Sequence, residues 1–156
     1  MGAVFFYELQ GAPLETTLPM LLDKARGQGW RVLVRGTDPA LLAQLDAALW
    51  QGPVDHFLPH GLSGGPHDAD QPVLLGDLPA TDFACVMAVG GAAVTAEEAM
   101  LLARACILFD SAENAKAQAR LQWKTLTDAG IAAQYWAQED GRWVKKAERD
   151  ARNAGE

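Results

Sequence analysis

The residue types and spacing best suited to binding lie on one predicted helix, over residues 111–129. Lys116, Arg120 and Lys124 recur at every fourth position, and Trp123 follows Arg120 by three. An α-helix turns by about 100° per residue, so these four side chains share one sector of its surface. Arginine can grip a carboxylate through two parallel hydrogen bonds, and an indole can receive an apolar side chain. These four residues, called the cationic stripe below, therefore suit an acidic peptide that ends in an apolar residue and a carboxylate.

The stripe also has a simpler interpretation, as a solvated helix face with a half-buried aromatic. The other side of the helix carries residues that can pack on a sheet: Ala115, Ala119, Gln122 and Leu126. Because that side faces inward, we expect Trp123 at the solvent edge, beside the cations.

The distribution of charge favours the binding interpretation. The formal charge of the 156-residue chain is −7, which opposes a main affinity for nucleic-acid phosphate. Residues 1–109 hold 5 basic and 12 acidic side chains, whereas residues 110–156 hold 8 of each. A locally cationic region on an acidic protein fits an acidic peptide and fits long DNA poorly. We expect no strong direct binding to DNA.

A second motif, Gly-Leu-Ser-Gly-Gly at residues 61–65, matches the GxSxG pattern of α/β-hydrolases. A nucleophilic serine in that pattern needs a strand before it and a helix after it. Here Pro59 and His60 precede the motif and Pro66 follows it. We therefore expect no catalytic residue and keep a small α/β hydrolase only as an alternative function.

A nucleotide-binding protein is the other alternative function, but the sequence lacks the glycine-rich loop that binds the nucleotide phosphates. Residues 10–15, after the first predicted strand, lack the GxGxxG pattern. Pro13 removes an amide donor, and Glu15 places negative charge at the helix start. We expect no bound nucleotide cofactor.

Metal-ligating side chains gather in one segment: Asp55, His56, His60, His67, Asp68 and Asp70. Imidazole and carboxylate suit Zn²⁺ or Mn²⁺. Pro59 interrupts any helix that would align His56 with His60, so we expect ordinary loop histidines and no metal site.

The cysteines and the chain start bear on the cellular compartment. Cys85 and Cys106 each lie in an apolar stretch without a CxxC partner, which favours buried, reduced thiols. The first residues include no basic segment and reach Glu8 too early for a signal peptide. Asp82 and Glu97 bracket the longest apolar run, which is shorter than the roughly 20 residues of a membrane span. We expect a cytoplasmic protein with no membrane association.

Alternating strands and helices must position these residues. Strands are expected over residues 3–9, 31–35, 73–75, 83–89, 105–109 and 131–136. Helices are expected over residues 14–28, 39–50, 95–103 and 111–129. This alternation predicts an α/β fold, a single domain with a mostly parallel sheet and helices on both faces. The architecture is Rossmann-like without a nucleotide-binding loop.

Local signals mark two helix starts. Asp38 followed by Pro39 is typical of an N-cap with proline at the first helical position. Thr95 and Glu98 have the spacing of a capping box, in which each side chain accepts a backbone amide of the other residue.

The chain has one irregular internal segment and a charged end. Residues 51–72 are rich in Gly, Pro and His and predict a long irregular loop. We divide the chain into a domain over residues 1–137 and a charged C-terminal tail over residues 138–156, with the last strand before it.

Four segments together resemble a known family. They are Phe-Tyr at residues 6–7, Leu-Asp-Ala-Ala-Leu-Trp at 45–50, Phe-Leu-Pro-His at 57–60 and Lys-Ala-Gln-Ala-Arg-Leu-Gln-Trp-Lys at 116–124. In these segments the chain resembles the chi subunit of bacterial DNA polymerase III, a DNA-directed DNA polymerase and nucleotidyltransferase complex. The resemblance implies a role in DNA replication without catalysis by this subunit itself.

The resemblance also implies a site and a partner. Chi proteins are adaptors that link the clamp loader to single-stranded DNA-binding protein (SSB) by capturing the acidic C-terminal tail of SSB. The family's tail-binding Lys, Arg and aromatic correspond here to Lys116, Arg120 and Trp123, with Lys124 adjacent and Phe109 lining the pocket. The family's aromatic is usually tyrosine, so Trp123 keeps the platform and changes its polar tip.

A second family contact is made to the psi subunit, or to a helicase that competes for the same face. In this sequence it corresponds to Trp50 and Phe57. The alternative interpretation of these two residues is a core tryptophan and a loop anchor.

Overall fold

The computed structural model describes residues 2–10, 13–51, 60–65 and 68–151. The strands are β1 (Ala3–Leu9), β2 (Val32–Arg35), β3 (His60–Leu62), β4 (Val73–Gly76), β5 (Cys85–Ala88), β6 (Arg104–Asp110), β7 (Ala132–Glu139) and β8 (Arg142–Arg149). The helices are α1 (Leu14–Gly27), α2 (Pro39–Trp50), α3 (Ala96–Leu101) and α4 (Glu113–Asp128), with a 3₁₀ turn, η1, at Asp68–Asp70.

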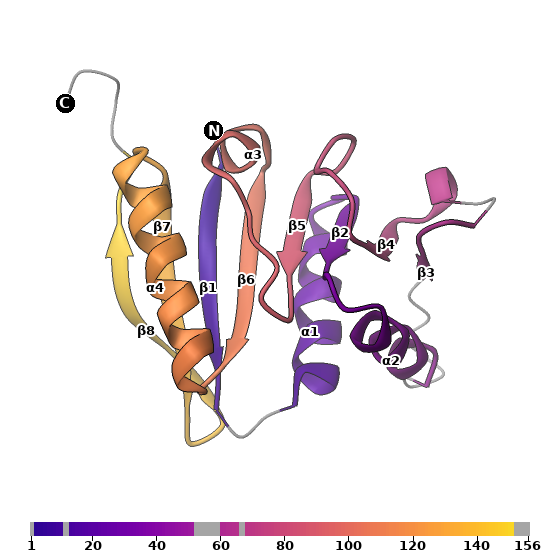
Figure 1. Ribbon diagram of the computed structural model, residues 1–156, viewed down its shortest axis with the longest axis horizontal. Coiled ribbons are helices and arrows are strands. Elements are labelled where there is room, and N and C mark those ends of the chain that lie inside the picture. The colour runs from indigo at the N-terminus through magenta and orange to yellow at the C-terminus, as the bar shows by residue number, and fades with distance from the viewer. Residues whose placement is uncertain (1, 11–12, 52–59, 66–67, 152–156) are drawn as a thin grey trace.

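These strands form one sheet in the order β3-β4-β2-β5-β6-β1-β7-β8 (Figure 1). Neighbouring strands are parallel, except that β7 and β8 are antiparallel. The first strand of the chain, β1, therefore lies inside the sheet, between β6 and β7. The predicted α/β fold with a mostly parallel sheet is confirmed.

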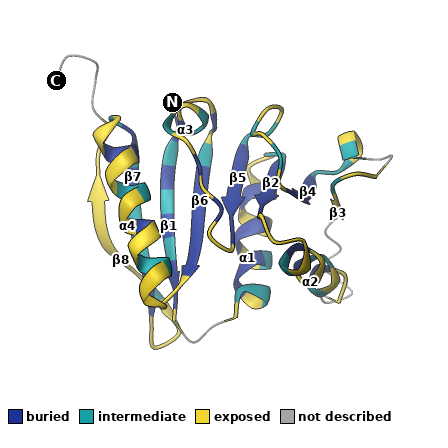
Figure 2. Cartoon of the chain, viewed as in Figure 1, coloured by how far each residue is buried: buried dark blue, intermediate teal, exposed yellow. Residues whose placement is uncertain are grey.

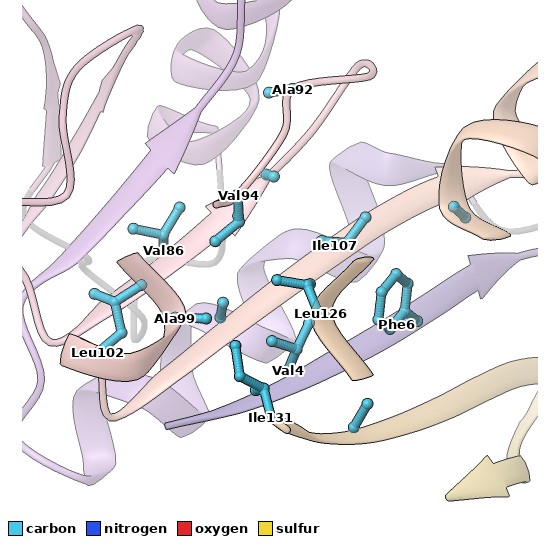
Figure 3. Close-up of a cluster of buried hydrophobic side chains, with 14 of the residues drawn as sticks. Val4, Phe6, Val86, Ala92, Val94, Ala99, Leu102, Ile107, Leu126 and Ile131 are labelled. Atoms are coloured by element: carbon cyan, nitrogen blue, oxygen red, sulfur yellow. The ribbon is translucent and has the colours of Figure 1, made fainter. Parts of the chain in front are cut away.

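Two buried clusters cover the two faces of the sheet, as predicted. Side chains alternate along a strand, so β1 presents Val4 and Phe6 to the face that α4 covers. Phe5 and Tyr7 turn to the opposite face and pack on the cluster of α1 and α2. Figure 3 shows Leu126 of α4 beside Val4 and Phe6. The sheet is thus a central layer between helices.

Both cap predictions are confirmed. The Asp38 carboxylate accepts the Ala40 amide at 3.0 Å, and Pro39 opens α2. The Thr95 hydroxyl accepts the Glu98 amide at 3.1 Å, and the Glu98 carboxylate accepts the Thr95 amide at 3.1 Å. These local bonds satisfy amides that a helix start leaves without partners.

The Glu98 carboxylate also ties α3 to the sheet through Arg35, the last residue of β2. Arg35 is 7% exposed, and its two terminal nitrogens donate to Glu98 Oε1 and Oε2 at 2.8 and 2.6 Å. Its guanidinium also donates to the carbonyl oxygens of Leu78 and Ala93, at 3.1 and 2.9 Å. The hydrogen bonds from Arg35, and secondarily that from the Thr95 amide, lower the pKa of Glu98 to about 2. One ion pair thus connects β2, two loops and α3.

The cysteines are buried and free, as predicted. Cys85 lies on β5 and Cys106 on β6, and neither forms a disulfide. A hydrogen bond to Cys85, together with burial, raises the pKa of the Cys106 thiol, so this group stays protonated.

No helix among the described residues is long and apolar enough to cross a bilayer.

β3 was not predicted, because it lies within the segment interpreted as an irregular loop. Its three residues pair in parallel with β4, from His60 opposite Val73 to Leu62 opposite Leu75. So short a strand carries no readable alternation of apolar and polar residues. Residues 52–59 and 66–67 of the same segment lie outside the described residues.

β8 was also not predicted. The strand expected to be the last, over residues 131–136, corresponds to β7, and β8 follows it. Residues assigned to a charged tail from 138 onward continue β7 to Glu139 and then return as β8. The turn is Asp140-Gly141, with positive φ values of 51° and 77°, which is the conformation of a two-residue hairpin turn. This Asp-Gly pair was the available signal. The alternation of β8 itself is hidden because it is an exposed, highly charged edge strand.

The Arg35–Glu98 ion pair predicts a specific acid dependence of stability. Glu98 has a pKa of about 2 in the folded protein against a usual 4.5, so its pairing stabilises the fold above pH 4.5 and is lost as the pH falls toward 2. Glu98→Gln should lower the free energy of unfolding at pH 7 and reduce its further loss at pH 3. Urea unfolding at both pH values measures this. Glu97, the exposed residue before Glu98, provides the control variant Glu97→Gln. An unchanged pH dependence in Glu98→Gln would contradict the prediction.

Candidate functional site

The site is built on α4, which connects β6 to β7 across β1. The helix begins after β6, where the Asp110 carboxylate accepts the Ala112 amide at 3.0 Å. Ala119 and Leu126 are 3% and 0% exposed and seat the helix on the sheet. In Figure 2, α4 alternates between exposed and intermediate residues on the side turned to the viewer. The inward face predicted from Ala119 and Leu126 is confirmed.

Trp123 belongs to a group of four rings, called the aromatic cluster below. Its ring centroid lies 5.4 Å from that of Phe6 and 6.3 Å from that of Tyr135. Tyr135 also stacks with Phe6 at 6.5 Å and meets Phe109 edge-to-face at 5.8 Å. These four residues come from α4, β1, β7 and β6 and meet over the sheet. Trp123 is half-buried, with its ring packed on Phe6 and the exposed cations beside it on α4, which agrees with the expected position at the solvent edge.

The cations of the stripe lie on the outer flank of this cluster. Lys116 is half-buried, and Arg120 and Lys124 are exposed. Lys124 Nζ lies 3.1 Å from Asp128 Oδ2, four residues along the helix. Within the described part of the chain, neither Lys116 nor Arg120 forms an ion pair, so both keep their donors for a ligand.

A buried carboxylate accepts a hydrogen bond from the aromatic cluster. Glu8 is 6% exposed and accepts the Tyr135 hydroxyl at 2.8 Å, as well as the Gln10 side-chain amide. Burial and this hydrogen bond raise the pKa of Tyr135 well above its usual value, while the positive charge of Arg120 opposes the shift. Tyr135 is therefore a neutral phenol held between Glu8 and the cationic flank.

Sequence reasoning missed both Glu8 and Tyr135. Each lies within a predicted strand, where one polar residue in alternation normally points to solvent. The only signal was a carboxylate in an otherwise apolar and aromatic first strand, Ala3–Leu9. Its partner is 127 residues away in the chain, and only the parallel pairing of β1 with β7 brings the two together.

A pocket of about 890 Å³ lies on the other flank of α4, at the carboxyl ends of β1, β5 and β6. Phe109 lines it, together with Gly90, Gly91, Gln118 and other residues. The described lining includes Asp110 and Glu15 but no Lys or Arg. This pocket is thus apolar to acidic, and the cations of α4 lie away from it.

Trp50 lies at the end of α2, far along the sheet from α4 (Figure 1). Its side chain is 53% exposed, and its ring contacts that of the buried His60 with centroids 4.3 Å apart. Trp50 is therefore not a core residue. Phe57, its predicted companion, lies outside the described residues.

The chain matches a protein family described as the DNA polymerase III chi subunit, HolC, over residues 1–134. It belongs to the chi family. No curated protein matches the chain. Membership establishes an accessory role in DNA replication with DNA polymerase III, which fits a non-catalytic subunit. The match includes the cationic stripe and Trp50, and it ends within β7, so β8 lies beyond it.

The GxSxG motif of this chi-family chain is not built as a nucleophile elbow. A strand does precede Ser63, namely β3, contrary to expectation. Ser63 donates its amide to Leu75 and is followed by a turn in which Asp68 accepts the amides of Gly64 and Gly65. No helix begins at Ser63, which is the feature that a hydrolase of this class requires.

The metal-ligating segment is only partly described. Asp55, His56 and His67 lie outside the described residues, whereas His60 contacts Asp46 and Trp50. Among the residues that the structure covers, no group of three His, Cys, Asp or Glu side chains could hold a metal ion.

The Glu8–Tyr135 bond predicts a stability effect. Tyr135→Phe leaves the buried Glu8 carboxylate without its hydroxyl donor, which should lower the free energy of unfolding by about 1–3 kcal/mol. The matched control is Tyr7→Phe, because the Tyr7 hydroxyl forms no hydrogen bond within the described chain. Urea unfolding compares the two, and equal losses would argue against a supporting role for Glu8.

Proposed function

We propose that this chi-family chain is an adaptor that links the clamp loader to SSB by binding the acidic C-terminal tail of SSB on the cationic stripe. The observation that carries the proposal is the position of Lys116 and Arg120, two cations that form no ion pair with any described residue, beside the half-buried rings of Trp123 and Tyr135. Charge and apolar surface meet at one place, as the end of such a tail requires.

Each part of the site has a part of the tail to bind. Arg120 receives the terminal carboxylate in a bidentate geometry. Trp123 and Tyr135, the half-buried rings of the aromatic cluster, receive the apolar side chain that precedes this carboxylate and lose little freedom on binding. Lys116 and Lys124 attract the acidic residues further upstream. The acidic remainder of the protein, with its formal charge of −7, discourages competing polyanions such as DNA.

The central prediction concerns Arg120. Arg120→Ala should weaken binding of an SSB tail peptide by at least about tenfold, because a charged hydrogen-bond partner of the carboxylate is lost. Arg120 is exposed, so the fold should be unaffected. Isothermal titration measures the affinity, and circular dichroism checks the fold.

The control is Lys24→Ala, which removes an exposed cation from α1, away from the stripe, and should leave the affinity unchanged. Trp123→Tyr, which introduces the usual residue of the family, should keep most of the binding. Equal affinities of wild type and Arg120→Ala would remove the site assignment.

We further propose that Trp50 is a separate contact, for the psi subunit or for a helicase that competes with it. The exposed indole at the end of α2 supports this, since a large exposed aromatic is typical of a protein interface. In this arrangement one end of the sheet binds the replication machinery and the other binds SSB.

This second contact predicts a separation of functions. Trp50→Ala should lower binding to psi or to the helicase by more than about tenfold, as expected for an interface hot spot, and leave SSB-peptide affinity unchanged. Arg120→Ala should do the reverse. Co-purification with each partner measures the first effect, and peptide titration the second. Loss of both activities in either variant would contradict two independent surfaces.

A further inference from the structure

β8 is an edge strand that the sequence match to the chi family does not reach. Residues 142–149 lie beyond its limit at residue 134. The strand pairs with β7 on one side and is exposed along nearly all its length (Figure 2). In Figure 1 it lies at the outer edge of the sheet, next to β7, the strand that α4 contacts. Its side chains can therefore add to the surface that the stripe begins.

Alternation sorts the charges of this hairpin between the two faces of the sheet. Ala133 and Tyr135 of β7 pack in the cluster with α4, so odd-numbered residues of β7 face that helix. Their cross-strand register places Arg149 opposite Ala133 and Arg142 opposite Glu139. These two arginines share the α4 face because the register shifts between Tyr135 and Trp136, where β8 has one extra residue. Lys146 reaches this face as well, since its ammonium contacts Glu139.

On the opposite face of β8, positive and negative side chains balance each other. Trp143 packs edge-to-face on Tyr7 with centroids 5.2 Å apart, and Lys145 pairs with Glu148 at 3.3 Å. The α4 face instead has three cations, Arg142, Lys146 and Arg149, and one carboxylate, Glu139. Arg142 and Arg149 form no ion pair with any described residue. Residues 110–156 carry equal numbers of basic and acidic side chains, yet the α4 face of β8 is positively charged.

We propose that β8 is the second wall of the tail site, and that Arg142, Lys146 and Arg149 bind acidic side chains preceding the apolar end of the bound peptide. This inference rests on the proposed function. One row of cations follows α4 and the other follows β8, with the strand β7 between them. An extended acidic peptide fits such a channel, because its side chains alternate at about 3.3 Å per residue and reach both walls.

The test uses two peptides with the same apolar C-terminal end, one with aspartates upstream and one with asparagines in their place. The variant Arg142→Gln/Arg149→Gln should lower affinity for the aspartate peptide by about three- to tenfold at low salt, with a smaller salt dependence. It should leave affinity for the asparagine peptide unchanged. The matched control, Lys24→Gln/Lys145→Gln, removes the same net charge from other surfaces and should change neither affinity.

The outcomes separate this inference from the proposed function. Equal effects on both peptides, or an equal loss in the control variant, would overturn the role of β8. Tail binding that needs Arg120 but ignores β8 would leave the stripe site intact and overturn only the second wall. Absence of peptide binding to wild type would overturn both. A single-stranded oligonucleotide bound by wild type and lost in Arg142→Gln/Arg149→Gln would assign β8 to nucleic acid instead. Circular dichroism confirms that each variant is folded.

Discussion

The packing of Trp123 on Phe6 and Tyr135 is the contact on which the candidate site depends. It fixes the rotation of α4 about its axis, because the ring must lie over β1 and β7. Once this rotation is set, Lys116 and Arg120 must lie on the same outer flank. The position of β1 between β6 and β7 is in turn what makes α4 cross over Phe6. Sheet order therefore decides where the charge is presented.

A cationic site on an acidic protein depends on the separation of charges that the fold imposes. Carboxylates near the site are mostly engaged: Glu8 accepts Tyr135, Asp128 pairs with Lys124, and Glu139 pairs with Lys146. On the same surface, Arg120, Arg142 and Arg149 are exposed and form no ion pair with any described residue. Arg35 of β2, elsewhere in the sheet, is instead buried and paired with Glu98. Local pairing, more than net charge, thus defines the proposed binding surface.

Sequence reasoning succeeded where the signal was local. The caps at Asp38 and Thr95 are set within four residues, and both were predicted, Thr95 together with its partner Glu98. The strands with continuous apolar runs were also found, since burial on both faces leaves a dense pattern. β3 and β8 were missed for opposite reasons: β3 is too short to show a period, and β8 is too polar. Neither strand has the apolar content by which strands are recognised.

The sequence by itself determined the α/β alternation, the position of the four stripe residues on one helix, and the family. Each of these follows from residue types and their spacing along the chain. Tertiary structure alone decided that Glu8 supports Tyr135 and that Trp50 is exposed. It also decided which face of β8 is positive. The physical reason is that burial and pairing depend on which strands become neighbours, and strand order in a parallel sheet is not written in any local segment.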